Sequence, residues 1–163
     1  MKKILIILLS VMLLLLTFGC QKEDDVLKYT QSGLTVELPE GMISGDENGF
    51  DIFLYNNDFM FSALKENYDI FNRIGYDPEK LTVEEYGKLI MEINNDDDQF
   101  EEDAFNNLYI SYTNTVDGQQ YYYYTTIRKG TDAFWLITFS SFASEKDTYS
   151  KLFAKWANTI VVE

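Results

Sequence analysis

The sequence predicts a mixed α+β fold in which helices cover both faces of an antiparallel β-sheet, an α/β/α sandwich. Residues 34–38 and 108–116 alternate apolar and polar side chains, as half-buried strands do. Residues 121–128 and 133–141 are apolar or aromatic on both faces, which is typical of central strands that are covered on both sides. Two further segments carry apolar side chains at helical spacing, and these amphipathic helices can supply the cover.

The first strands are bounded by turn residues. Residues 26–30 are expected to form a strand, and residues 31–33 (Gln-Ser-Gly) turn the chain into the strand 34–38, which Pro39 ends. Residues 45–49 form a loop.

A second pair of strands is predicted around three polar residues. Residues 50–55 and 59–64 are apolar and rich in aromatic side chains, and Asn56, Asn57 and Asp58 lie between them. Because asparagine tolerates positive φ, this pattern predicts a hairpin. Residues 67–75 are compatible with a short helix that Gly75 closes.

The clearest helix start lies at Thr82. Thr82 and Glu85 have the spacing of a capping box, and Leu81 and Tyr86 are placed for a hydrophobic staple. A single apolar stripe follows at positions i, i+3, i+4 and i+7: Tyr86, Leu89, Ile90 and Ile93.

The C-terminal part predicts a meander followed by a second helix. Asp117-Gly118 is a strong hairpin signal between the strands 108–116 and 121–128, and residues 129–132 turn again into 133–141. Ser144 and Asp147 resemble a second capping box. The stripe of this helix is Tyr149, Leu152, Phe153 and Trp156; Asn158 can close the helix, and residues 160–162 form a short last strand.

The first twenty residues have the parts of an export signal. Lys2 and Lys3 precede the apolar run 4–16, which only Ser10 interrupts and which is shorter than the about 20 residues that a membrane-spanning helix needs. Cys20, the only cysteine, directly follows Gly19. With this pair the segment resembles a bacterial lipoprotein signal, and the resemblance implies that Cys20 is acylated and becomes the first residue of the mature protein.

This interpretation gives the chain three parts. Residues 1–19 are the signal peptide, residues 20–25 are a polar tether, and residues 26–163 are one globular domain. Two acyl chains on Cys20 suffice for stable anchoring in a lipid bilayer, so we expect the protein at the extracytoplasmic face of a cell membrane. There are two alternatives. The segment stays as an uncleaved N-terminal anchor, or ordinary signal cleavage near Cys20 leaves this residue with a free thiol.

Charge and composition narrow the function. Loss of residues 1–19 removes two of the 13 Lys and Arg and none of the 27 Asp and Glu, so the remaining 144 residues carry a net charge of −16. Such a charge repels nucleic acid and anionic lipid headgroups, which makes both poor partners. The chain has no histidine, and its one cysteine is at the signal. This excludes zinc sites built on His or Cys. It also excludes nucleophile pairs of the Ser-His or Cys-His type. No cofactor is expected.

The segment 94–103 holds six acidic residues but does not match an EF-hand loop. With Asn94 in the first position, Gln99 stands where glycine must turn the chain, and Phe105 stands where a bidentate glutamate is needed. A looser cation site through Asp96, Asp98 and Glu101 is one hypothesis, and a solvated acidic loop is the default. Acid–base chemistry by Glu101, Glu102 and Asp103 is a further hypothesis, although nothing places two of them across a cleft.

The tyrosine run 121–124 suggests a ligand-binding face. Alternation sends Tyr121 and Tyr123 to one side of the strand and Tyr122 and Tyr124 to the other. Together with Trp135 on the neighbouring strand, Tyr121 and Tyr123 are candidates for an aromatic platform that binds a sugar or a peptide. Packing of these side chains in the core is the alternative.

Two segments resemble a known family. Residues 33–41 (GLTVELPEG), and the ending in which residues 132–139 (DAFWLITF) lead to residues 155–160 (KWANTI), are similar to bacterial PsbP-like lipoproteins, distant relatives of the extrinsic PsbP subunit of photosystem II. The resemblance covers about residues 26–163. It implies an antiparallel sheet between helices and a non-enzymatic role in assembling or supporting a membrane complex; no functional residue carries over.

The leading expectation is therefore a membrane-anchored, non-enzymatic binding or assembly module with a protein partner in the cell envelope. The alternative is a lipoprotein that binds a small ligand or a cation, through the acidic loop or the tyrosine-rich face of the sheet. A hydrolase built on carboxylates ranks third.

Overall fold

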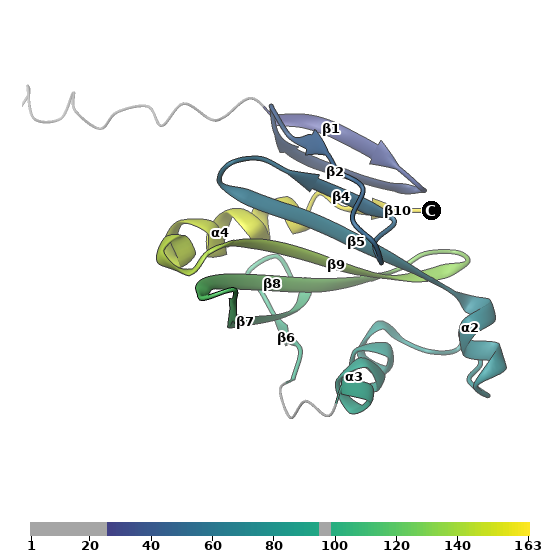
Figure 1. Ribbon diagram of the computed structural model, residues 1–163. Helices are drawn as coiled ribbons and strands as arrows, with labels where there is room; N and C mark the ends of the chain where they lie inside the picture. The colour runs from purple at the N-terminus through teal and green to yellow at the C-terminus, as the bar shows by residue number, and fades with distance from the viewer. Residues whose placement is uncertain (1–25, 95–98) are drawn as a thin grey trace, which may run out of the picture.

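The described part of the chain forms two antiparallel sheets and three α-helices. The computed structural model describes residues 26–94 and 99–163, so Cys20 and the predicted signal and tether lie outside the described residues. Figure 1 shows the two sheets one above the other, with the helices around the larger sheet. The elements are β1 Val26–Gln31, β2 Leu34–Pro39, β3 Ile43–Ser44, β4 Ile52–Tyr55, β5 Phe59–Asn67, α2 Tyr68–Arg73, α3 Val83–Asn94, β6 Glu101–Glu102, β7 Leu108–Val116, β8 Gln119–Lys129, β9 Ala133–Phe142, the 3₁₀ turn η1 Ala143–Glu145, α4 Lys146–Ala157 and β10 Val161–Val162.

The larger sheet has the strand order β3-β4-β5-β9-β8-β7-β6, and the smaller sheet has the order β1-β2-β10. The strands predicted from alternation are present, and the meander β7-β8-β9 is antiparallel as expected. The separation of β1 and β2 into a second sheet was not predicted. The strand β2 pairs with β1 and not with a strand of the larger sheet. Its inward side chains pack against the face of the larger sheet: Leu34, Val36 and Leu38.

The two faces of the larger sheet differ, and each is named here after the helix on it. On the α4 face, Phe153 stacks on Phe139 with ring centroids 5.2 Å apart, and Trp156 stacks on Phe59 at 4.7 Å. The smaller sheet covers the rest of this face, so the main core lies between the two sheets and α4.

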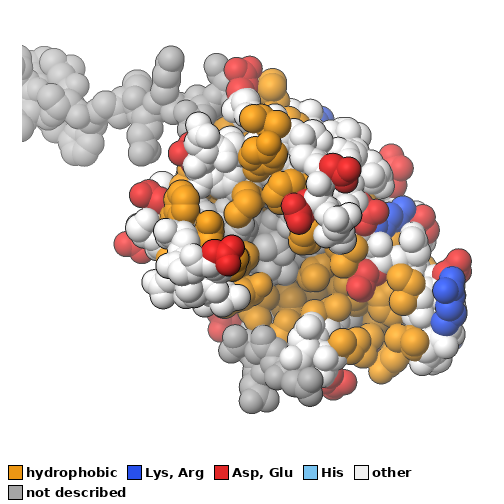
Figure 2. Space-filling view, in the orientation of Figure 1, with side chains coloured by type: hydrophobic (Ala, Val, Ile, Leu, Met, Phe, Trp, Pro, Cys, Tyr) orange, Lys and Arg blue, Asp and Glu red, His pale blue; other side chains and the backbone are white. Residues whose placement is uncertain are grey.

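On the α3 face, helices cover only one end of the sheet. Tyr86 of α3 stacks on Phe134 at 4.4 Å, and Phe71 of α2 meets the same ring edge-on at 5.4 Å. Figure 2 shows hydrophobic side chains gathered where α2 and α3 approach the sheet. The α+β class and the antiparallel sheet are thus confirmed, whereas full helical cover of both faces, the predicted α/β/α sandwich, is not.

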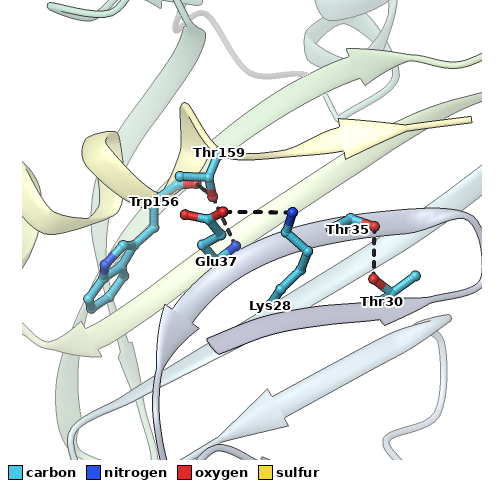
Figure 3. Close-up of polar contacts among 6 residues, drawn as sticks. All are labelled: Lys28, Thr30, Thr35, Glu37, Trp156 and Thr159. Carbon is cyan, nitrogen blue, oxygen red and sulfur yellow. Dashed lines mark hydrogen bonds and ion pairs between the residues drawn. The ribbon is translucent and has the colours of Figure 1, made fainter. Parts of the chain in front are cut away.

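The smaller sheet is tied to the C-terminal end of α4. The backbone N–H of Glu37 donates to Thr159 Oγ1 at 2.9 Å, and that hydroxyl donates to the carbonyl oxygen of Trp156 at 2.7 Å (Figure 3). An ion pair of 3.9 Å between Lys28 and Glu37 joins β1 and β2 on the same side. These bonds hold β2 against the core while its inward side chains exclude water.

The predicted turns and caps are only partly as expected. The Thr82 capping box is present, with Glu85 N–H donating to Thr82 Oγ1 at 3.2 Å and Thr82 N–H to Glu85 Oε2 at 2.8 Å. The box predicted at Ser144 is wrong, because a 3₁₀ turn precedes α4 and no side chain caps the helix. The hairpin at Asn56 does not use positive φ; Asn56 Oδ1 accepts from the N–H groups of Asp58 and Phe59 at 2.9 Å, as in an Asx turn.

Candidate functional site

The part of the α3 face that none of the described helices covers carries a group of aromatic side chains. Four of them form what we call the aromatic surface: Tyr112, Tyr121, Tyr123 and Phe142. Tyr123 of β8 lies opposite Tyr112 of β7, and their rings stack with centroids 5.0 Å apart. Tyr121 lies opposite Phe142 of β9 and stacks on it at 5.5 Å.

These rings are accessible. Tyr112 is 42% exposed and Phe142 is 40% exposed, while Tyr121 and Tyr123 are half-buried by their neighbours. Burial, and to a lesser extent the nearby Tyr121 hydroxyl, raises the pKa of Tyr123. Its phenol is therefore protonated at neutral pH and offers a hydrogen-bond donor at the end of a stacked ring.

A second aromatic group lies farther across the same face. Tyr55 and Phe53 of β4 contact each other with centroids 5.7 Å apart, and Tyr55 is 37% exposed. Four side chains lie between this pair and the aromatic surface, and the two serines among them are buried: Met60, Ser62, Thr138 and Ser140. The arrangement offers flat rings that carry phenol hydroxyls, which suits contact with a peptide or a sugar more than chemistry on a substrate.

The structure brings together Tyr121 and Tyr123 but not Trp135, the third predicted member of this face. The β8–β9 register pairs Arg128 with Trp135, so Trp135 shares a face with Tyr122 and Tyr124. It is fully buried in the main core, and Lys65 Nζ lies 5.7 Å from its ring centroid. Trp135 is therefore a core residue and is removed from the candidate site.

The sequence analysis did not include Tyr112 and Phe142 in this face, although the sequence holds a signal for Tyr112. A two-residue loop at Asp117-Gly118 fixes the register of the hairpin, and that register places Tyr112 opposite Tyr123. Phe142 follows a longer turn, for which sequence gives no comparable rule.

The candidate cation site is not assembled in the described residues. Asp96 and Asp98 lie outside them, and Glu101 is exposed on β6, paired with Tyr109. Within residues 26–94 and 99–163, no group of three His, Cys, Asp or Glu side chains is arranged to hold a metal ion.

Asp103, considered for acid–base chemistry, belongs to a structural network. Its Oδ2 accepts from the Tyr124 hydroxyl at 2.7 Å and from Asn107 Nδ2 at 2.8 Å. Asn107 in turn accepts from Arg128, which also donates to the carbonyl oxygen of Ala157 at the end of α4. Burial lowers the pKa of Arg128, but the guanidinium remains charged at neutral pH. This network joins the loop before β7 to β8 and α4.

A pocket lies between the two sheets. It has a volume of about 160 Å³, with apolar walls that include Leu34, Ile52 and Phe61 and with Tyr29 and Gln31 on its lining. Two of the polar side chains on its lining bond to the protein: Tyr29 donates to the carbonyl oxygen of Pro39 at 3.2 Å, and Gln31 donates to that of Asp51 at 3.1 Å.

None of the helices in the described residues has the length and hydropathy needed to cross a membrane. No family model matches the chain, and no curated protein matches it.

Among solved structures, the chain is similar to the solution structure of the cyanobacterial PsbP (CyanoP) of Synechocystis sp. PCC 6803. The identity is 17% and the TM-score 0.46, over 90% of this chain and 98% of that one. It is also similar to a crystal structure from Bacteroides thetaiotaomicron VPI-5482, at 13% identity and a TM-score of 0.49, over 86% of this chain and 49% of that one. The first of these belongs to the family that the sequence resembles, and the likeness is one of fold.

Proposed function

We propose that the chain is a lipoprotein held at the extracytoplasmic face of a cell membrane by acylated Cys20, and that residues 26–163 are a non-enzymatic binding or assembly module for a protein partner in the cell envelope. The observation that carries the binding role is the aromatic surface, where Tyr112 and Phe142 are about 40% exposed on a rigid sheet. The signal-like segment ending at Cys20 supports the location.

Stacked tyrosines suit a protein interface. Each ring presents a large apolar area with only two rotatable side-chain bonds, and each hydroxyl can bond to a partner's polar group. The contacts between Tyr112 and Tyr123, and between Tyr121 and Phe142, fix the rings before binding, which lowers the entropy lost in a complex.

Charge restricts the partner. The net charge of −14 for the chain opposes binding to nucleic acid and to acidic proteins, and favours a neutral or basic surface. No residue of the aromatic surface is charged, so the partner meets apolar rings on a protein of negative net charge.

The test is in-cell crosslinking of the full chain, with single substitutions on and off the aromatic surface. Tyr123→Ser and Tyr112→Ser remove the stacked pair. Tyr76→Ser is the matched control, because Tyr76 is 40% exposed but lies after α2, away from the aromatic surface. The proposal expects one crosslinked product that persists in Tyr76→Ser and is lost in the other two; a product unchanged in all three would contradict it.

Binding of a small ligand at the aromatic surface is the second candidate. The half-buried ring of Tyr123, stacked on the exposed ring of Tyr112, is the kind of surface on which sugar rings stack. Thermal shift of the purified protein against sugars, short peptides and calcium separates the candidates. A shift that Tyr123→Ser abolishes would support this function, and unchanged melting with every compound would eliminate it.

A further inference from the structure

The pocket between the two sheets lies on the α4 face of the larger sheet but away from α4 itself. Its lining comes from β1 and β2 of the smaller sheet, from β3, β4 and β5 of the larger sheet, and from Met42; it includes no residue of α4 (Figure 1). Two connections join the sheets beside it: residues 40–42 lead from β2 to β3, and Gln31 donates to the carbonyl oxygen of Asp51 at 3.1 Å. The pocket is therefore built by the two sheets and by the links between them.

The floor of the pocket is apolar and closed to bulk water. Its side chains are at most 4% exposed: Leu34, Val36, Ile52, Leu54 and Phe61. Half-buried Met42 adds an unbranched side chain, which adapts to the shape of what it contacts. A buried water needs about three hydrogen-bond partners, and these apolar side chains offer none. The floor therefore favours apolar atoms over water.

The mouth of the pocket is polar and carries no charge. Gln31 and Ser44 line the pocket and are exposed, so they mark the side on which it opens to solvent. Their amide and hydroxyl groups can bond to a neutral polar substituent. Lys28, the basic residue of β1, lies on the opposite face of the smaller sheet, where it pairs with Glu37. None of the lining residues is charged, so a carboxylate or phosphate in the pocket would lose water without gaining a cation.

We propose that this pocket binds a small neutral molecule that has an apolar body the size of one aromatic ring and a polar substituent at the mouth. Apolar cavities of about 150 Å³ bind benzene. The pocket has a volume of about 160 Å³, and its floor presents the ring of Phe61 beside aliphatic side chains. The site is separate from the aromatic surface, because Tyr123 lies on the α3 face and the pocket is on the other face of the same sheet.

Two probes of similar size test the chemistry of the ligand: benzyl alcohol, which is neutral, and benzoate, which is charged. The full chain is held in lipid nanodiscs, so that no detergent competes for the pocket, and equilibrium dialysis fixes the aqueous concentration of each probe. Methyl NMR should show saturable shifts with benzyl alcohol at the floor residues, Val36 and Ile52 among them. Benzoate should bind about tenfold more weakly or not at all, because its charge has no partner in the pocket.

Ile127 is the internal control for these spectra, because it is buried on the α3 face, in the cluster around Phe134. Three results would overturn the proposal: shifts that do not saturate, shifts at Ile127 as large as those at the floor of the pocket, and equal binding of the two probes. This comparison uses the original sequence, so it does not depend on the folding of any variant.

Ser44 allows the pocket to be filled from an exposed position. Ser44→Trp places a ring at the mouth while the buried floor stays unchanged, and it should abolish saturable binding of benzyl alcohol. Ser44→Ala keeps the space and should keep the binding. Thr113→Trp is the matched control, since Thr113 is also exposed on a strand but lies on β7 and does not line the pocket. Unchanged binding in Ser44→Trp, or equal loss in Thr113→Trp, would contradict the site.

Tyr123→Ser separates the pocket from the aromatic surface. Benzyl alcohol should bind this variant as it binds the original sequence, because Tyr123 does not line the pocket. Loss of binding would assign the probe to the aromatic surface and refute the pocket as its site. The crosslinking that tests the partner-binding role has a different readout, so either proposal can fail while the other stands.

Discussion

Tyr124 donates a 2.7 Å hydrogen bond from its hydroxyl to Asp103 Oδ2, and this bond joins the segment after β6 to the centre of the larger sheet. Asp103 also accepts from the backbone N–H and the side-chain amide of Asn107, at 2.9 and 2.8 Å. Burial opposes the charge of this carboxylate, but the bonds from Tyr124 and Asn107 outweigh it, so the pKa of Asp103 is lowered. Burial and the bond to Asp103 raise the pKa of Tyr124.

The lowered pKa predicts that Asp103 stabilises the protein at neutral pH and not in acid. A carboxyl with a folded pKa below its unfolded value contributes stability above the unfolded value, and loses it as the pH falls through the folded value. Asp103→Asn should therefore lower the free energy of unfolding at pH 7 by about 1–3 kcal/mol. The difference from the original protein should shrink as the pH falls below about 4. Urea unfolding at pH 7 and pH 3 measures it, with the exposed Glu101→Gln as the control; a difference independent of pH would contradict the assignment.

Gly130 predicts a steric effect at the C-terminus. A Cβ on Gly130 would lie 2.3 Å from the backbone oxygen of Glu163, which accepts from the N–H of Thr131 at 2.9 Å. Gly130→Ala must displace the end of the chain and should cost about 1–3 kcal/mol. The control is Gly87→Ala in α3, where the added Cβ lies 3.1 Å from side-chain atoms of Ile127 and Phe100, not from backbone, and where alanine favours the helix by about 1 kcal/mol. Thermal unfolding should rank Gly87→Ala above Gly130→Ala, and the reverse order would contradict the contact.

Most of the fold could be predicted from the sequence because its signals are local. The Thr82 capping box, the Asp117-Gly118 turn and the stripe that ends at Trp156 depend only on neighbours in the chain, and each element is present where it was expected. The second sheet could not be predicted, because alternation in residues 34–38 gives an inward face without giving its partner strand.

The residues of the candidate site could be predicted only where the sequence fixes which face of its strand a side chain occupies. Alternation alone separated Tyr121 and Tyr123 from Tyr122 and Tyr124, and the structure has this arrangement. Trp135 was assigned to the wrong face because the turn between β8 and β9 has no composition that fixes its register, and a shift of one residue exchanges the faces of a strand. The partial cover by α2 and α3 depends on tertiary packing and has no signal in the sequence.

Two phenylalanines on β9 predict that the aromatic surface contributes little to stability. Phe139 is fully buried between Phe61 and Phe153, whereas Phe142 is 40% exposed on the α3 face. Phe139→Ala should lower the free energy of unfolding by about 3–5 kcal/mol. Phe142→Ala should lower it by about 1 kcal/mol or less. Denaturant unfolding measures both; a large loss for Phe142→Ala would mean that the surface is part of the folding core.

The anchoring of the chain is tested at Cys20, the only cysteine. If Cys20 carries the acyl chains, Cys20→Ala should abolish incorporation of a radiolabelled fatty acid and release the protein from membranes, because about 0.8 kcal/mol per buried CH₂ is then lost over each chain. Gln21→Ala is the control, since it alters the neighbouring residue and keeps the thiol. Label that persists in Cys20→Ala would contradict acylation at this position. A protein that stays in membranes, with no label in either form, would identify the apolar run 4–16 as an uncleaved anchor, and the partner would then meet the same domain on a different tether.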